Sequence, residues 1–235
     1  MMKEPDSDYY LRRREKLLRG FDRLAARLTK SLAARHGDAF AEAVVAETRV
    51  NFAGLIPSLP YIGGGRNIFT WVMIVNGGMV ALYRAMEARG QTAEGTVRVC
   101  AEVFDELFRS WPGSLLRLAG KLSFTPVVRR VLRKQAERSQ RRQYAADFVY
   151  ELREVDDELA LVFDECAVNK YYEAEKAEAL KPYCNFFDVT YSRLMDMGVD
   201  ARETIGLGCE KCSLRYKHRR DTVIPASLDG VLPRT

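Results

Sequence analysis

The stretch that decides the predicted fold is Phe148–Cys166, FVYELREVDDELALVFDEC. It contains two short apolar runs, residues 148–153 and 159–163, on either side of the acidic segment Val155–Glu158. Short runs rich in aliphatic and aromatic residues, with a turn between them, are typical of a β-hairpin. We therefore predict two paired strands here, with Cys166 directly after the second.

Two helices and a second hairpin are predicted after Cys166. The helical patterns cover residues 167–179 and 186–197, and the hairpin pairs residues 203–207 with residues 213–216. The order strand–strand–helix–helix–strand–strand yields a four-stranded, mostly antiparallel sheet with helices on one face. The predicted fold class is therefore α+β.

The chain before this sheet is predicted to form a helical half. Apolar residues recur at helical spacing in residues 8–35, 38–51, 68–89 and 92–110. Two prolines and three glycines make residues 56–67 a defined loop. We divide the chain into three parts: the helical region with its Gly-rich loop (1–146), the strand–helix region with the candidate cysteines (147–218), and an irregular tail (219–235).

Composition and charge favour a globular protein that binds small molecules. The 235 residues suit one domain, or a domain with a helical annex, and the net charge is +5. This charge favours anionic small molecules and is too small to predict nucleic-acid binding. The most basic segment, residues 127–145, is interpreted as a solvated helix face or as a surface for an acidic partner or phosphate-bearing ligand. Formation of a homo-oligomer is left open.

No membrane or export segment is predicted. Residues 1–6 are charged and lack the apolar core of a secretory signal. The longest apolar run, Ile68–Tyr83, is interrupted by Asn76-Gly77-Gly78 and is shorter than the ~20 residues of a membrane span. The five cysteines are an odd number, which together with the missing signal indicates reduced thiols and a cytoplasmic protein.

Three cysteines are candidates for a catalytic site. Cys166 lies where a strand leads into a helix, and the unpaired N–H groups at a helix N-terminus lower the pKa of a thiol. Cys184 precedes Asp188 by one helical turn, so both side chains are expected to face the same space. Cys212 begins the last strand. We expect Cys166, Cys184 and Cys212 around one cavity; the alternative for each is a small buried apolar residue, which suits Cys100 best.

No cofactor is predicted, and a metal is an open but not favoured alternative. Cys209 and Cys212 form a C-x-x-C motif, but a structural metal site needs a second ligand pair. Cys166 and Cys184 are poorly spaced for that role. Because histidine is nearly absent from the sequence, Asp188 is the better-placed acid–base partner for a thiol.

The glycine loop is a candidate anion site. Successive glycines at Gly63–Gly65 allow backbone N–H groups to approach an anion, while Arg66 adds a carboxylate clamp and Asn67 a hydrogen bond. The loop does not match a dinucleotide or Walker pattern, so nucleotide binding is not predicted. A tight structural turn is the alternative.

Two segments of the chain carry a family resemblance. The first is Ile56–Gly64, IPSLPYIGG, with Asn67 after it. The second joins Cys166, Cys184 and Asp188 to the ending Arg202–Tyr216, RETIGLGCEKCSLRY. Together they resemble the L-2-amino-thiazoline-4-carboxylic acid hydrolase family over roughly residues 50–217. The chain departs from the family at Ala167, where Pro is usual, and at Ser213-Leu214, where Asp-Phe is usual.

The resemblance implies a hydrolase that cleaves a C–N bond in a small cyclic amidine-like or aminothiazoline-like substrate, with or without a carboxylate. Cys184 is the first choice as nucleophile, with Asp188 as proton shuttle; Cys166 is the second choice, and Cys212 assists or lines the site. The expected substrate-binding residues are Tyr61, Gly63, Gly64, Arg66, Asn67 and Arg215. Of these, the two arginines are expected to bind a substrate carboxylate.

Two other functions remain open from the sequence. One is a non-catalytic small-molecule-binding or sensor domain, because the strand–Gly–Cys–strand ending also looks like vinyl-reductase-type binding domains. The other is a metal-dependent hydrolase with the cysteines and Asp188 as ligands.

Overall fold

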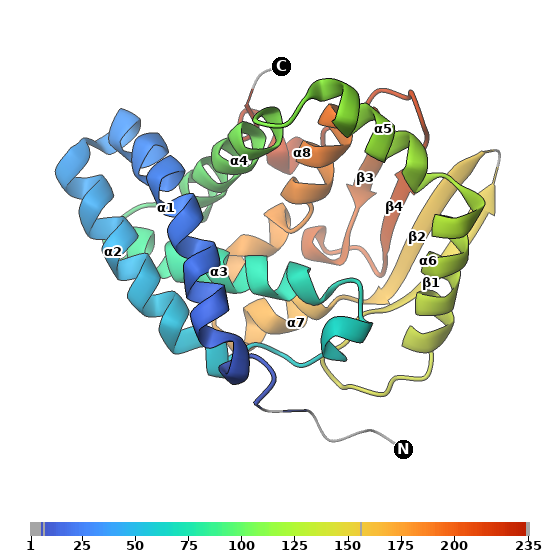
Figure 1. Cartoon of the computed structure of the whole chain (residues 1–235), viewed down its shortest axis with the longest axis horizontal. Coiled ribbons are helices and arrows are strands. Elements are labelled where there is room, and N and C mark those ends of the chain that lie inside the picture. The colour runs from blue at the N-terminus through green and yellow to red at the C-terminus, as the bar shows by residue number, and fades with distance from the viewer. Residues whose placement is uncertain (1–5, 7, 156, 234–235) are drawn as a thin grey trace.

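The computed structural model of the chain describes residues 6, 8–155 and 157–233. Helices form its N-terminal half and a four-stranded antiparallel sheet forms the C-terminal part (Figure 1), which confirms the predicted α+β class. Residues 1–5, on which the predicted lack of an export signal mainly rests, lie outside the described residues, as do Asp156 of the first predicted turn and the last two residues of the tail.

Six α-helices precede the sheet in the described part of the chain: α1 Arg14–His36, α2 Asp38–Leu55, α3 Thr70–Glu87, α4 Ala93–Arg109, α5 Gly113–Ser123 and α6 Pro126–Ser139. Gly37 separates α1 from α2 with a φ of 85°, which favours glycine. The Thr92 hydroxyl caps α4 by accepting a hydrogen bond from the Gly95 N–H at 3.1 Å. Helix α5 was not predicted, because its start follows the apparent stop signal Trp111-Pro112.

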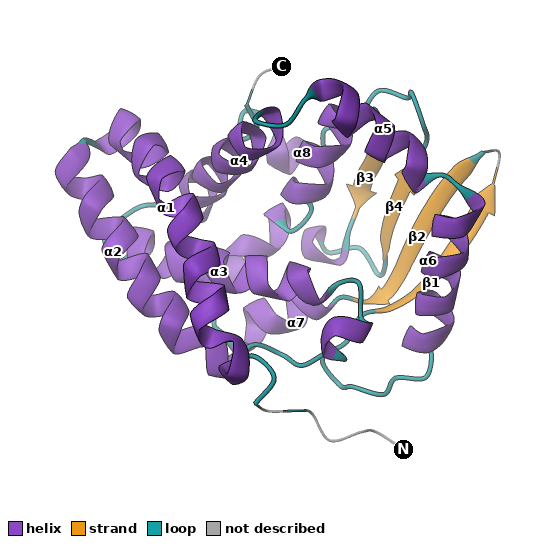
Figure 2. Ribbon diagram, in the orientation of Figure 1, coloured by secondary structure: helices purple, strands orange, loops and turns teal. Residues whose placement is uncertain are grey.

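The sheet consists of β1 Val149–Val155, β2 Glu158–Glu165, β3 Val199–Glu203 and β4 Cys212–Tyr216 in the spatial order β1-β2-β4-β3 (Figure 2). The helices α7 Ala167–Ala174 and α8 Phe186–Leu194 separate the two hairpins along the chain. Leu161 pairs with Leu214, and Phe163 pairs with Cys212. Because side chains alternate along a strand, these four residues share the face that packs against the helices, with Arg215 on the opposite face.

The third strand was predicted in the wrong place. It covers Val199–Glu203, whereas Ile205–Leu207, predicted to be strand, forms a short 3-10 turn. The Thr204 hydroxyl accepts a hydrogen bond from the Leu207 N–H at 3.2 Å, which stabilises this turn. The turn brings Thr204 to the wall of a cavity.

The C-terminal tail is irregular but packs into the fold. Val223 forms an isolated bridge with Asp200 of β3. Leu228, Val231 and Leu232 are buried in the core. The tail therefore covers the β3 edge of the sheet and is packed against the core.

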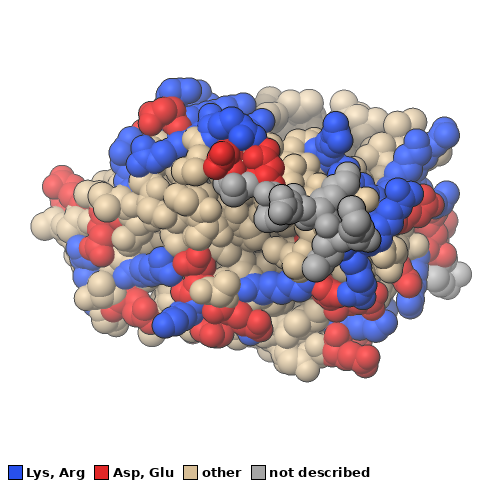
Figure 3. Space-filling model, turned by 90° about the horizontal axis from the view of Figure 1, so that it is seen from below, with Lys and Arg blue, Asp and Glu red and all other residues tan. Residues whose placement is uncertain are grey.

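Charges of both signs are intermingled on the molecular surface. On the face shown in Figure 3, basic and acidic side chains alternate without a large area of one sign. Ion pairs such as Arg84–Glu175, at 2.7 Å, connect separate elements. On this face the net positive charge is therefore not collected into one patch.

Candidate functional site

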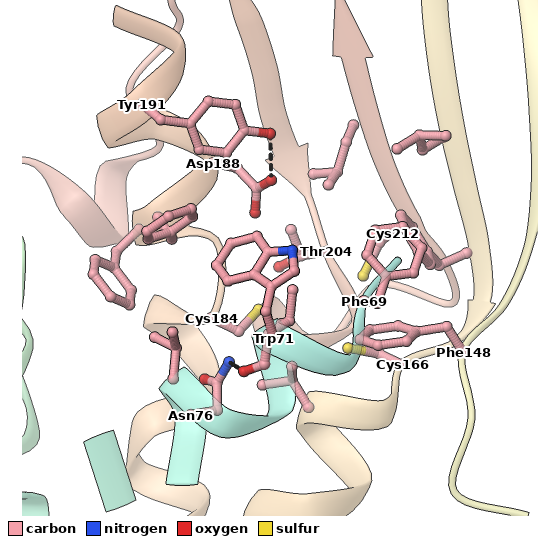
Figure 4. Close-up of a pocket in the computed structure, with 18 of the residues that line it drawn as sticks. Phe69, Trp71, Asn76, Phe148, Cys166, Cys184, Asp188, Tyr191, Thr204 and Cys212 are labelled. Carbon is pink, nitrogen blue, oxygen red and sulfur yellow. Dashed lines mark hydrogen bonds between the residues drawn. The ribbon is translucent and has the colours of Figure 1, made fainter. Parts of the chain in front are cut away.

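A small cavity lies between the N-terminal part of α3, α8 and the inner face of the sheet (Figure 4). Its volume is about 260 Å³, which suits a single small ring system more than a drug-sized ligand. Its aromatic wall is formed by Phe69, Trp71, Phe148, Phe163, Phe186, Phe187, Tyr191 and Tyr216. Asp188 is the only Asp, Glu, Lys or Arg among the described residues that line the cavity.

Three cysteines from separate elements share the wall of this cavity. Cys166 is the N-cap residue of α7, Cys184 follows the 3-10 helix Glu178–Tyr183, and Cys212 is the first residue of β4. Folding thus brings together the three thiols that the sequence singled out. Cys100 lines a different cavity in the helical half, and Cys209 is exposed.

Cys166 has the environment of a stabilised thiolate. The neighbouring Cys212 thiol, acting as a donor, is the main cause that lowers the pKa of Cys166. The backbone N–H groups of Val168 and Asn169 lie in the first turn of α7, directly after Cys166, and they lower the pKa further. The side-chain amide of Asn169 also lowers the pKa, and it is buried without a hydrogen-bond partner among the described residues. These donors outweigh the cost of burying a negative charge.

Cys184 and Cys212 have the opposite character. Burial raises the pKa of Cys184, and negative charges on Cys166 and Asp188 raise it further. The interaction of Cys212 with Cys166, together with burial, raises the pKa of Cys212. The Ile205 N–H donates to the Cys212 sulfur at 3.1 Å, so the Cys212 thiol proton is free to point at Cys166. Of the three thiols, Cys166 is the one that ionises first.

Asp188 is held at another side of the cavity by two tyrosines. Its Oδ1 accepts hydrogen bonds from the Tyr216 hydroxyl at 2.8 Å and from the Tyr191 hydroxyl at 3.1 Å. Burial raises the pKa of Asp188, and the two hydrogen bonds oppose this effect. The other carboxyl oxygen points toward the middle of the cavity (Figure 4). Asp188 can therefore accept a hydrogen bond from a ligand or hold a proton at this position.

The predicted arginine anchors do not line this cavity. Arg215 lies on the outer face of β4 and binds Asp200 at 2.7 Å. Arg66 is exposed, and its carbonyl accepts hydrogen bonds from Gln135 and Arg138. The expectation that these two guanidinium groups hold a substrate carboxylate in the cysteine site does not fit this placement.

The remaining loop residues have structural contacts. The Asn67 amide donates to the Ile62 carbonyl at 2.7 Å and to Asp147 at 3.0 Å. A Cβ on Gly64 would lie 2.5 Å from the Tyr9 ring, and Gly63 has a φ of 108°. The ring of Tyr61 packs on Tyr9 and Tyr144. The glycine loop is thus a tight turn, and it contributes to the cavity only through the residues that follow it, Ile68 and Phe69.

Several cavity residues were not identified from the sequence. Tyr191 follows Asp188 by nearly one helical turn, and Tyr216 lies on the same strand face as Cys212, so spacing alone carried a signal for both. Trp71 and Phe187 pack against each other with ring centroids 4.8 Å apart. Their contact joins α3 to α8, and no local pattern indicates it.

The described residues contain no group of three or more His, Cys, Asp or Glu side chains placed to hold a metal ion. Within the same residues, no helix combines the length and apolar character that crossing a membrane requires. Comparisons with protein-family models, with curated proteins and with solved structures gave no significant match. The functional argument therefore rests on the geometry of the cavity.

Proposed function

We propose that this chain is a thiol-dependent hydrolase that opens a small, flat, amidine-like ring, with Cys166 as the nucleophile. The observation that carries the proposal is the position of Cys166, which lines an aromatic-walled cavity as the N-cap residue of α7 and has its pKa lowered by Cys212 and by the first N–H groups of that helix. A thiolate is the reactive form of cysteine, and catalytic cysteines are stabilised by donors of this kind. This replaces Cys184, the first choice from the sequence, whose pKa is raised by burial.

The proposed reaction uses two thiols in different roles. The Cys166 thiolate adds to the amidine carbon and forms an S–C bond. Collapse of this adduct breaks the ring C–N bond, and the departing nitrogen takes the proton of the Cys212 thiol. A water molecule then adds to the S-bound carbon, one of its protons returns to Cys212, and the Cys166 thiolate leaves. The net reaction is hydrolysis of the amidine, and both thiols regain their starting states.

The cavity supports a neutral or cationic ring as substrate. Asp188 can receive an N–H of an amidine through the carboxyl oxygen that points into the cavity. The aromatic wall suits a flat ring, and aromatic faces attract cations. Since neither Arg66 nor Arg215 lines the cavity, a substrate carboxylate has no partner of that kind there. The family resemblance supports the amidine class, and the cavity supports members without a carboxylate.

The proposal is tested with a panel of 2-aminothiazoline and cyclic guanidine rings, each with and without a ring carboxylate. Product formation is followed by liquid chromatography and mass spectrometry. Cys166→Ser is expected to lower kcat/KM by about three orders of magnitude or more, as loss of a nucleophile does. Cys184→Ser is the matched control and should retain activity within about tenfold.

Two outcomes would overturn the proposal. Loss of turnover in Cys184→Ser with retention in Cys166→Ser would assign the chemistry to Cys184. No turnover of any ring by the wild-type protein, together with tight binding of one of them, would support a non-catalytic binding domain, which the apolar aromatic wall also suits.

A further inference from the structure

A second and larger cavity lies in the helical half, away from the three catalytic candidates. Its volume is about 560 Å³, and its walls come mainly from α1, α3 and α4. Helix α1 packs against α2 and α4 more extensively than against α3, and this leaves space between α1 and α3. Gly20 of α1 and Gly78 of α3 line this space, and a Cβ added at either position meets no atom within 4 Å. The absence of two side chains therefore helps to keep the cavity open.

The interior of this second cavity is apolar. Met79 and Leu82 of α3 and Val103 of α4 line it and are buried. The lining also includes Leu17, Phe21, Leu24, Leu28, Phe52, Ile74 and Phe104. No Asp or Glu is among the described residues that line it. The interior therefore suits a hydrocarbon chain and offers no partner for a cation.

The rim of the cavity is basic. Lys16, Arg19 and Arg23 line it, are exposed, and recur at helical spacing along α1. None of the three has a carboxylate partner within the described ranges, whereas Lys30, further along α1, binds Glu106 at 3.4 Å. Three exposed cations at the edge of an apolar cavity complement an anionic group attached to an apolar chain.

We propose that this second cavity binds a single-chain anionic amphiphile of the fatty-acid type. The alkyl chain lies between α1 and α3, and the carboxylate lies at Lys16, Arg19 and Arg23. The site is independent of the proposed hydrolase activity. Val75 and Phe186 line both cavities, so the two sites share part of a wall.

The test uses isothermal titration calorimetry with three ligands of equal chain length: decanoate, decan-1-ol and decylammonium. Decanoate is expected to bind in the micromolar range, and decylammonium at least about tenfold more weakly, since like charges repel at the rim. Equal affinity for decanoate and decylammonium would contradict the assigned anionic head group.

One variant tests the location of the alkyl chain. Gly78→Leu places a side chain in the open space and should weaken decanoate binding by about tenfold or more, because it occupies the volume that the ligand needs. Gly54→Leu is the matched control, since Gly54 is exposed on α2 and its Cβ meets no atom within 4 Å. Gly20→Leu provides an independent second obstruction if Gly78→Leu does not fold. Unchanged decanoate binding in a folded Gly78→Leu or Gly20→Leu protein would overturn the proposal.

A second variant tests the head group. Replacing Lys16, Arg19 and Arg23 together by Gln should weaken decanoate binding about fivefold to fiftyfold, because exposed pairs contribute little singly but add up. Binding of decan-1-ol should stay within about twofold, since it carries no charge. The matched control replaces Arg130, Lys134 and Arg141 by Gln and removes the same charge elsewhere. An equal loss of decanoate binding in both triple variants would reduce the effect to net charge and contradict the assigned rim.

Discussion

Cys166 and Cys212 share the wall of one cavity, and the Cys212 thiol does more than any other group to lower the pKa of Cys166. Cys212→Ala removes the donor, so the pKa of Cys166 should rise. We expect the rate of Cys166 alkylation by iodoacetamide at neutral pH to fall about tenfold, since one pKa unit corresponds to a factor of ten in thiolate population. Peptide mapping after timed alkylation measures this rate. An unchanged rate in Cys212→Ala would mean that α7 alone stabilises the thiolate.

Asp188 lines the cavity whereas Arg66 and Arg215 do not, and this difference gives a second prediction. Asp188→Asn keeps an oxygen for the hydroxyls of Tyr191 and Tyr216 but loses the charge. It should raise KM for an amidinium substrate about tenfold to a hundredfold, the effect of losing a charged hydrogen bond of about 1.5–3 kcal/mol. Arg66→Ala and Arg215→Ala should leave KM within about twofold because neither side chain lines the cavity. A large KM effect in either arginine variant would show that the cavity is not where substrate binds.

Asp147 gives a prediction about pH and stability. Burial raises the pKa of Asp147 to about 6, and its carboxylate accepts hydrogen bonds from Asn67 at 3.0 Å and from the Phe148 N–H at 2.8 Å. The folded protein binds this proton more tightly than the unfolded chain. The stability that the group contributes is therefore present in full only below about pH 4, the pKa of the unfolded chain, and is lost as the pH rises through about 6.

Asp147→Asn keeps an acceptor for both donors and removes the titration. Its Tm relative to wild type should therefore rise as the pH is raised from about 4 to about 7.5. Thermal unfolding followed by circular dichroism across this range measures the difference. A difference in Tm that stays constant with pH would contradict the raised pKa.

Helix α5 packs so closely on the chain after α8 that residue 120 must be glycine. A Cβ at Gly120 would lie 1.8 Å from the Met195 carbonyl oxygen. Gly120→Ala is expected to lower the free energy of unfolding by about 1–3 kcal/mol or more, because the backbone must move. Gly54→Ala is the matched control in α2 and should raise it by up to about 1 kcal/mol, since it replaces an unhindered helical glycine. Urea unfolding distinguishes the two, and equal effects would exclude the close contact.

The sequence predicted the first hairpin well because its apolar alternation is local. Strand β3 was misplaced because Asp200, a residue typical of loops, is buried there in ion pairs with Arg202 and Arg215. Those pairs hold the pKa of Asp200 down, to about 2. Helix α5 was missed because Trp111-Pro112 marks a helix start as well as a stop. Local sequence patterns cannot distinguish strand from loop at Asp200, or helix start from helix stop at Trp111-Pro112, since tertiary contacts decide both.

The candidate site was likewise predictable from the sequence only in part. Cys166 and Cys212 were placed correctly at strand ends, because strand–helix and turn–strand junctions are visible in the sequence. The order of thiol acidities was not predictable, because it depends on a contact between two distant parts of the chain. The position of Arg66 outside the cavity likewise depends on α6, whose Gln135 and Arg138 hold the loop.

The most direct test of the central claim is the identity of the residue that becomes covalently modified during turnover. The wild-type protein is mixed with a ring that it hydrolyses, quenched with acid within the first turnover, digested and analysed by mass spectrometry. We predict a mass increment equal to the opened ring on the Cys166 peptide, and none on that peptide in Cys166→Ser. An increment on Cys184 instead, or steady turnover without any increment on a cysteine under conditions that trap an authentic thioimidate, would contradict the assignment of Cys166 as the nucleophile.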